Sequence, residues 1–94
     1  TINILPEIVD KVGKLVEVHI DGGIRSGQDV VKAMCLGAKG TYIGRAFLYG
    51  LGALGKVGVT KALNIIKSET DMTMALCGRR NIHDLNRENI YIPK

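Results

Sequence analysis

The 94-residue sequence is poor in the residue types that mark several classes of protein. It has no tryptophan, three tyrosines and one phenylalanine, and its lysines and arginines are spread along the chain. A nucleic-acid interface needs clustered basic residues interleaved with aromatic ones, whereas the densest basic spot here is the pair Arg79 and Arg80. The net charge of +4 therefore predicts a dispersed, solvated surface that suits a small anionic ligand and no nucleic-acid partner.

Long apolar runs are absent as well. No stretch approaches the roughly eighteen consecutive apolar residues of a transmembrane helix, and the first residues lack the basic leader and cleavage site of a signal peptide. The sequence does not begin with methionine, and a helical pattern starts almost at once. We therefore expect a piece of a longer protein, located in the cytoplasm or peripherally at the inner face of the membrane.

Cysteine is scarce, and its spacing does not indicate a metal site. Cys35 and Cys77 lie far apart, each within an apolar helical pattern, and neither forms a Cys-x-x-Cys or Cys/His motif. We expect two buried free thiols in a reducing compartment and no metal.

Four further residues are of types that often take part in catalysis or cofactor binding, but each has a simpler interpretation. His19 lies within an apolar strand pattern and is predicted to be a packed or neutral core histidine, whereas His83, in the polar tail, is predicted to be a surface residue. Met72 and Met74 are expected to fill the core along a long helix. None of the four is a predicted catalytic residue.

Helical and strand patterns alternate along the chain. Apolar residues spaced three and four apart, Pro6 in a first turn, and Ser26 followed by Asp29 in the form of a capping box indicate helices. The β-branched residues of 14–20 indicate a strand. The predicted elements are a helix over 5–12 ending at Gly13, a strand over 14–20, a helix over 27–37 closed by Gly37, a strand over 40–44, a short helix over 46–55, a long helix over 56–76 and a capped turn or short helix over 81–90.

This order predicts an α/β fold. Strands that alternate with helices imply parallel strands joined by right-handed crossovers. Two strands alone cannot close a sheet or cover both of its faces. The pattern therefore predicts a slice of a larger α/β protein, either a barrel or an open sheet.

Both predicted strands end in glycine followed by arginine. The first ends in "DGGIR" at 21–25 and the second in "GR" at 44–45. Glycines let a ligand approach the backbone, helix N-termini attract anions, and guanidinium groups form charge-assisted bonds with phosphate. Asp21 would repel a phosphate, so we expect it to accept hydrogen bonds from neighbouring hydroxyl groups. These residues together predict a site for a ligand with a phosphate and a hydroxylated chain, as in the usual phosphate site of a barrel.

The stretch "HIDGGIRSGQDVVKAMCLGAKGTYIGRAFLYGLGALGKVGV…TMALCGRRNIHDL" resembles a known family. It is similar to the C-terminal end of the FMN-dependent α-hydroxy-acid oxidases and dehydrogenases, which include glycolate oxidase, L-lactate dehydrogenase and mandelate dehydrogenase. The resemblance covers nearly the whole chain. It implies that residues 1–94 are the C-terminal fragment of a single FMN-binding TIM (β/α)8 barrel domain, comprising its last two βα units.

The resemblance also implies the cofactor FMN. Arg25, Gly44 and Arg45 would hold its phosphate, and Asp21 and Gly23 would meet its ribityl chain. The full implied cofactor-binding set is Asp21, Gly22, Gly23, Ile24, Arg25, Gly44 and Arg45.

In such enzymes an L-2-hydroxy acid is oxidised to the 2-oxo acid, a histidine takes the hydroxyl proton and the flavin accepts the hydride. The family's histidine belongs to a His-Gly-Gly-Arg motif that precedes this segment, and neither His19 nor His83 matches it. The chain is therefore expected to contain no catalytic residue and to be inactive alone. We expect the parent to bind FMN and a small 2-hydroxy acid and to form a homo-oligomer.

Two alternatives remain. Barrels of the IMP dehydrogenase and GMP reductase type carry a D-G-G-I-x-x-S-G-D phosphate loop similar to "DGGIRSGQDVVKA", although they usually follow the next strand with glycine and serine rather than "GRAF". The chain could instead be a non-catalytic remnant that self-associates through its unpaired strand edges.

Overall fold

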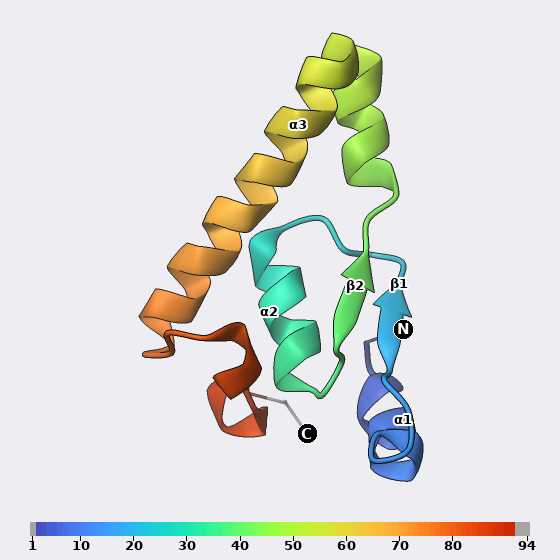
Figure 1. Ribbon diagram of the computed structural model, residues 1–94, viewed down its shortest axis with the longest axis vertical. Coiled ribbons are helices and arrows are strands. Elements are labelled where there is room, and N and C mark those ends of the chain that lie inside the picture. Colours follow the sequence, from blue (N-terminus) through green and yellow to red (C-terminus); the bar gives the residue numbers. More distant parts are fainter. Residues whose placement is uncertain (1, 92–94) are drawn as a thin grey trace.

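The computed structural model describes residues 2–91 of the chain, and the elements follow the predicted order. They are α1 (Leu5–Val12), β1 (His19–Asp21), α2 (Gly27–Cys35), β2 (Gly40–Tyr42), α3 (Arg45–Leu76) and the 3-10 turns η1 (Ile82–Asp84) and η2 (Arg87–Asn89) (Figure 1).

The first strand is shorter than the sequence indicates. Its β-branched pattern predicts a strand from residue 14, but the backbone N–H groups of Leu15 and Val16 both donate to the carbonyl of Val12, at 2.9 and 3.0 Å. These bonds prolong the turn that follows α1. The apolar side chains of Leu15 and Val16 are consequently exposed, and the strand begins only at His19.

The two strands form a parallel pair, as predicted. His19 lies opposite Gly40, and Asp21 lies opposite Tyr42. Of the three residues in β1, Ile20 is buried while the residues on either side of it are exposed, because successive side chains point to opposite faces of a sheet. The sheet therefore has one covered face and one open face, and His19 and Asp21 share the open one.

Helix α2 begins with the cap that the sequence indicates, in a modified form. The Ser26 hydroxyl accepts from the backbone N–H of Asp29 at 3.3 Å. In a reciprocal capping box the Asp29 carboxylate would accept from the backbone N–H of Ser26. Here it accepts instead from the backbone N–H of Arg25 at 3.0 Å. The helix ends before Gly37, whose φ of +103° allows the predicted closing turn.

The buried core lies between α1, β1 and α2, and a second apolar cluster joins α2 to the C-terminal turns. The first cluster consists of Leu5, Ile20, Ile24, Ala33, Leu36 and Ala38. The second consists of Val31, Met34, Cys35 and Leu85, against which Met74 packs.

Burial corrects two of the predictions made for single residues. Met74 contacts the second cluster, but Met72 is 67% exposed, so the prediction that it fills the core is wrong for this chain. Cys35 is buried as predicted, whereas Cys77 is only half-buried because it follows the last turn of α3. His83 is exposed, as predicted.

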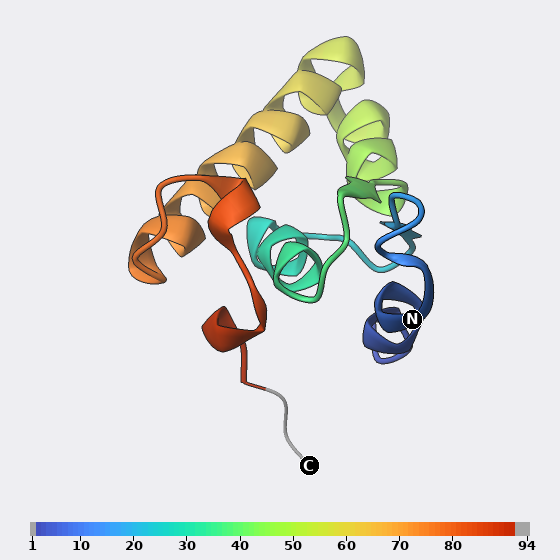
Figure 2. The ribbon, with the colours of Figure 1, turned by 60° about the horizontal axis from the view of Figure 1, so that its bottom comes forward.

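Helix α3 is a helical hairpin rather than one rod. Gly55 has φ +63° and ψ −141°, which separates the two helices that the sequence predicts (Figures 1 and 2). The two arms approach so closely that a Cβ on Gly50 would lie 2.5 Å from the carbonyl oxygen of Gly58. Glycine at both positions therefore permits backbone-to-backbone contact.

The long arm of α3 packs along α2 (Figure 2). The two helices approach closely at Gly27, the first residue of α2, where a Cβ would meet the backbone of Glu69 and Thr70. The backbone N–H of Gly27 also donates to the Glu69 carboxylate at 3.3 Å. The N-terminus of α2 is therefore covered by α3 and already has anionic partners.

The C-terminal turns are capped as the sequence indicates and return to the first helix. Asn81 and Asn86 cap η1 and η2 with their side chains. The Arg87 guanidinium then donates to the Asp10 carboxylate of α1 at 2.8 Å and contacts the carbonyl of Pro6 at 3.4 Å.

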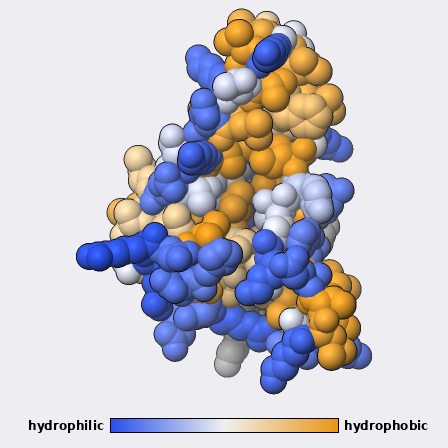
Figure 3. All heavy atoms as spheres, in the orientation of Figure 1, coloured by the Kyte–Doolittle hydropathy of each residue, from blue (hydrophilic) through white to orange (hydrophobic). Residues whose placement is uncertain are grey.

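A large apolar surface remains open on the α3 hairpin (Figure 3). Its exposed apolar side chains are Leu48, Tyr49, Leu51, Leu54 and Val57. None of the helices within residues 2–91 combines the length and the apolarity needed to cross a bilayer.

Candidate functional site

The carboxyl ends of β1 and β2 lie side by side, and each continues into a glycine-containing loop (Figure 1). Because the strands are parallel, the loop after Asp21 and the loop after Tyr42 leave the sheet at the same edge. The first loop leads into α2 and the second into α3. The structure therefore brings both predicted phosphate-binding segments to one edge, which we call the strand-end rim (residues 21–25, 44 and 45).

The loop after β1 requires glycine for its backbone conformation. Gly22 has φ +105° and Gly23 has φ +80°, and a Cβ built on either would meet no other atom within 4 Å. The loop is thus strained for other residues and open on its outer side. Ile24 is 5% exposed, and its side chain anchors the loop in the core cluster.

The N-terminus of α3 offers unpaired hydrogen-bond donors. Gly44 is its N-cap residue and Arg45 its first residue, and no side chain caps this end. The first N–H groups of a helix have no partner within the helix and carry the positive end of its dipole. A Cβ at Gly44 would meet nothing within 4 Å, so the space in front of these N–H groups is open.

The two helix N-termini at this edge differ in the hydrogen-bond partners that they already have. The N-terminus of α2 already has the Ser26 hydroxyl and the carboxylates of Asp29 and Glu69 as partners. The N-terminus of α3 has none of these, and Arg45 adds a positive charge there. The donor set of the strand-end rim, glycine backbone and α3 N–H groups with two arginines, fits a phosphate monoester.

The predicted site residues therefore lie on adjacent loops, and all except Ile24 are exposed. The exposed residues are Asp21, Gly22, Gly23, Arg25, Gly44 and Arg45. The carboxylate of Asp21 forms no hydrogen bond or ion pair with another residue in the described range 2–91, so it remains available to accept from hydroxyl groups.

His19 is not packed in the core as the sequence predicts, because its ring lies on the open face of the sheet with 38% of its side chain exposed. Its Nδ1 lies 3.2 Å from the hydroxyl of Tyr42, and its Nε2 lies 3.6 Å from the Glu17 carboxylate. Sequence analysis missed Tyr42 altogether. The available signal is its place two residues before the Gly44–Arg45 pair, which corresponds to the strand-end position of Asp21.

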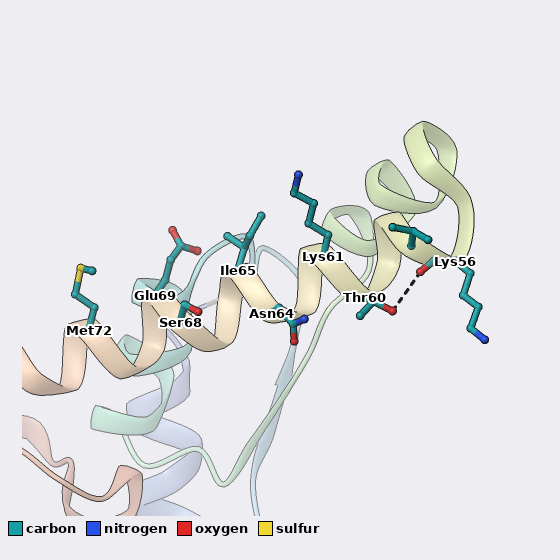
Figure 4. A pocket seen from close by; sticks show the side chains of 9 residues that line it. Lys56, Thr60, Lys61, Asn64, Ile65, Ser68, Glu69 and Met72 are labelled. Carbon is teal, nitrogen blue, oxygen red and sulfur yellow. Dashed lines mark hydrogen bonds between the residues drawn. The ribbon is translucent and has the colours of Figure 1, made fainter.

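A separate groove lies on α3, away from the strand-end rim. It has a volume of about 780 Å³ and runs along the outer face of α3 from Lys56 to Met72 (Figure 4). Its side chains are spaced along one helix and do not converge on a common point, and Thr60 donates to the carbonyl of Lys56. This groove lacks the convergent polar groups of a ligand site. Residues 2–91 also contain no group of three histidines, cysteines or carboxylates arranged to hold a metal.

Comparison with known proteins places the chain among flavoenzymes. Residues 1–92 match the family described as FMN-dependent dehydrogenase. The chain is 50% identical over 93 residues to a pre-mycofactocin synthase of Mycolicibacterium smegmatis, an alignment that covers 99% of this chain and 23% of the relative. It is 46% identical over 87 residues to 2-hydroxyacid oxidase 1 of Homo sapiens, covering 93% and 24%, respectively.

The fold is also similar to that of a solved structure. A soluble mutant of the membrane-associated (S)-mandelate dehydrogenase from Pseudomonas putida matches with a TM-score of 0.89 and 41% identity, over 94% of this chain and 25% of that one. The chain thus spans about a quarter of the length of these relatives. Sequence and structure agree that the chain belongs to the FMN-dependent dehydrogenase family.

Proposed function

We propose that the strand-end rim holds the phosphate and part of the ribityl chain of FMN. The observation that carries this proposal is the uncapped N-terminus of α3 beside the positive-φ loop of Gly22 and Gly23, at one edge of a parallel pair. Arg25 and Arg45 supply charge for the phosphate, and Asp21 accepts hydrogen bonds from the hydroxylated chain. Gly44 leaves room for the phosphate to reach the α3 N–H groups.

We further propose that residues 1–94 form the last two βα units of a single TIM (β/α)8 barrel domain. The parallel strand pair, with helices on one side and an open face on the other, supports this placement. In a barrel the open face would turn inward, and the strand-end rim would lie at the face where barrel active sites form.

For the full-length protein we propose oxidation of an L-2-hydroxy acid to the 2-oxo acid. The 46% sequence identity with 2-hydroxyacid oxidase 1 and the structural similarity to mandelate dehydrogenase support this activity. FMN, when bound, supplies the two-electron acceptor. The residues of this chain bind and orient the cofactor, and they do not provide the base: His19 begins β1, at the opposite end from the rim, and His83 lies in η1.

The reaction of the pre-mycofactocin synthases is a second candidate, because one of them is 50% identical to this chain. Both candidate reactions would use FMN held at the strand-end rim, and the residues described here do not distinguish the two substrates. An assay of the full-length protein with lactate, glycolate and mandelate separates them. Turnover of one of these acids supports the first candidate, and its absence in a flavin-loaded protein favours the second.

The FMN proposal is tested by the flavin content of the full-length protein. Arg45→Ala removes a charge-assisted contact, and we expect it to weaken FMN binding by about 10- to 100-fold. Arg80→Ala is the matched control, because Arg80 is exposed and follows the far end of α3. Equal flavin retention after dialysis of both variants would contradict the proposal.

The family match does not favour a barrel of the IMP dehydrogenase type. The remaining alternative, a colourless self-associating remnant, is separated by size-exclusion chromatography with detection of flavin absorbance. A yellow protein supports the proposed role. The cytoplasmic or peripheral location and the homo-oligomer stay predictions.

A further inference from the structure

The open face of the sheet carries a polar arrangement that the FMN cradle does not use. His19 and Tyr42 belong to different strands, and their rings lie 5.7 Å apart between centroids at an angle of 42°. Tyr42 lies directly opposite Asp21 in the strand register, while His19 lies two residues earlier on the same face as Asp21. The phenol of Tyr42 therefore has two possible partners on β1, the imidazole of His19 and the carboxylate of Asp21.

The structure shows which partner Tyr42 takes. Its hydroxyl is 3.2 Å from Nδ1 of His19, so the phenol leans back toward the start of β1 and away from Asp21. Gly40 eases this arrangement, because a Cβ there would lie 3.2 Å from the His19 ring, a tight contact. The absence of a side chain at Gly40 leaves room for the imidazole to lie across β2.

Glu17 favours one tautomer of His19. Its carboxylate lies 3.6 Å from Nε2, an electrostatic contact that favours a proton on that nitrogen. In the tautomer that carries its proton on Nε2, Nδ1 accepts a hydrogen bond from the Tyr42 hydroxyl. In that tautomer the hydroxyl hydrogen of Tyr42 is used in the bond to His19 and is not available to Asp21.

We propose that His19 is a positioning residue that holds the Tyr42 hydroxyl away from Asp21 and so keeps the Asp21 carboxylate free for the hydroxylated chain of the cofactor. This inference rests on the proposed FMN site. Without an acceptor at position 19, the remaining acceptor side chain on β1 is Asp21, which lies opposite Tyr42 in the strand register. A Tyr42–Asp21 hydrogen bond would compete directly with the ligand for that carboxylate.

The test measures FMN affinity of the full-length protein by quenching of flavin fluorescence. His19→Phe and His19→Leu both replace the acceptor with an apolar side chain, so either variant suffices if the other does not fold. We expect each to weaken FMN binding by about 3- to 10-fold, the effect of one competing hydrogen bond. His19→Gln retains an acceptor for Tyr42 and is expected to stay within about twofold of wild type.

The decisive variant is the double substitution. Tyr42→Phe alone leaves Asp21 free and is expected to change FMN affinity by less than about twofold, and His19→Phe combined with Tyr42→Phe is expected to restore near-wild-type affinity. A double variant as weak as His19→Phe would overturn the inference, because His19 would then act only structurally. Unchanged affinity in both single His19 variants would overturn it too. Failure of the wild-type protein to bind FMN would overturn the proposed function and this inference together, a result distinct from the other two.

Discussion

The backbone N–H of Gly27 lies 3.3 Å from the Glu69 carboxylate, so the first residue of α2 rests directly on α3. No side chain separates the two helices at this point, since a Cβ on Gly27 would meet the backbone of Glu69 and Thr70. The contact positions α2 and α3, the two helices that follow the strand-end rim, relative to each other. It also directs one carboxylate to the N-terminus of α2, whereas no side chain caps the N-terminus of α3.

A first prediction concerns this helix contact. Gly27→Ala forces α2 away from α3, and we expect the free energy of unfolding to fall by about 1–3 kcal/mol, as for other overpacked positions. Gly52→Ala is the control, because a Cβ there meets nothing within 4 Å; it is expected to be neutral or to stabilise by up to about 1 kcal/mol. Urea unfolding of both variants measures the difference, and equal stabilities would contradict the described packing.

A second prediction separates the fold from the ligand site. Gly44→Val places its side chain in open space, so we expect the thermal midpoint to remain close to that of wild type. The same side chain blocks the approach of a phosphate to the N-terminus of α3. FMN binding is therefore expected to weaken by at least about tenfold, the effect of losing a hydrogen bond to a charged group. Wild-type flavin content in a folded variant would show that the phosphate lies elsewhere.

A third prediction concerns the ion pair of Arg87 and Asp10, whose side chains are 47% and 64% exposed. Because solvent screens exposed pairs, we expect a coupling free energy of only about 0.2–1 kcal/mol despite the 2.8 Å contact. A double-mutant cycle with Asp10→Ala and Arg87→Ala measures it, and added salt should reduce it. A coupling free energy of about 3 kcal/mol that does not change with salt concentration would indicate a buried pair instead.

A fourth prediction follows from the thiol of Cys35. Burial raises its pKa above the ordinary value of 9.0, and the neighbouring Cys77 adds to the shift while Arg79 opposes it. The neutral thiol is favoured in the folded state, so its stabilising effect is complete below the pKa of the unfolded thiol and is lost as the pH rises through the folded pKa. We expect the stability advantage of wild type over Cys35→Ala to shrink above about pH 9.

Alkylation provides an independent measurement of the same thiol. At neutral pH, iodoacetamide is expected to modify the half-buried Cys77 before the buried Cys35, because only the accessible thiolate reacts. Mass spectrometry of partly modified protein identifies the order. Faster reaction of Cys35 would contradict its burial.

Local patterns in the sequence predict most of the fold. The 5–12 helix, the Ser26 cap and the closing turn at Gly37 depend on neighbouring residues only, and the structure confirms each. The start of the first strand could not be predicted, because Leu15 and Val16 have the composition of a strand while their N–H groups bond to the preceding helix. Composition does not show where a backbone donor finds its partner.

The candidate site divides in the same way. Glycine followed by arginine at two strand ends is visible in the sequence, and the parallel register brings the two segments together. The Glu69 contact at the N-terminus of α2 was not predictable, because Glu69 lies 42 residues from Gly27 in the sequence. The exposure of His19 was missed for a related reason: strand periodicity does not tell which face a single strand pair leaves open.

Insertions and deletions are usually tolerated at exposed bends between helices. The bend at Gly55 is different, because the two arms of α3 touch through Gly50 and Gly58 and leave no room for a side chain at either position. Deleting one residue between them would rotate the second arm by about 100° and bring a valine to the contact. The spacing of these two glycines is therefore a length constraint on the chain, and alignments of the family should show substitutions around Gly55 but few insertions or deletions.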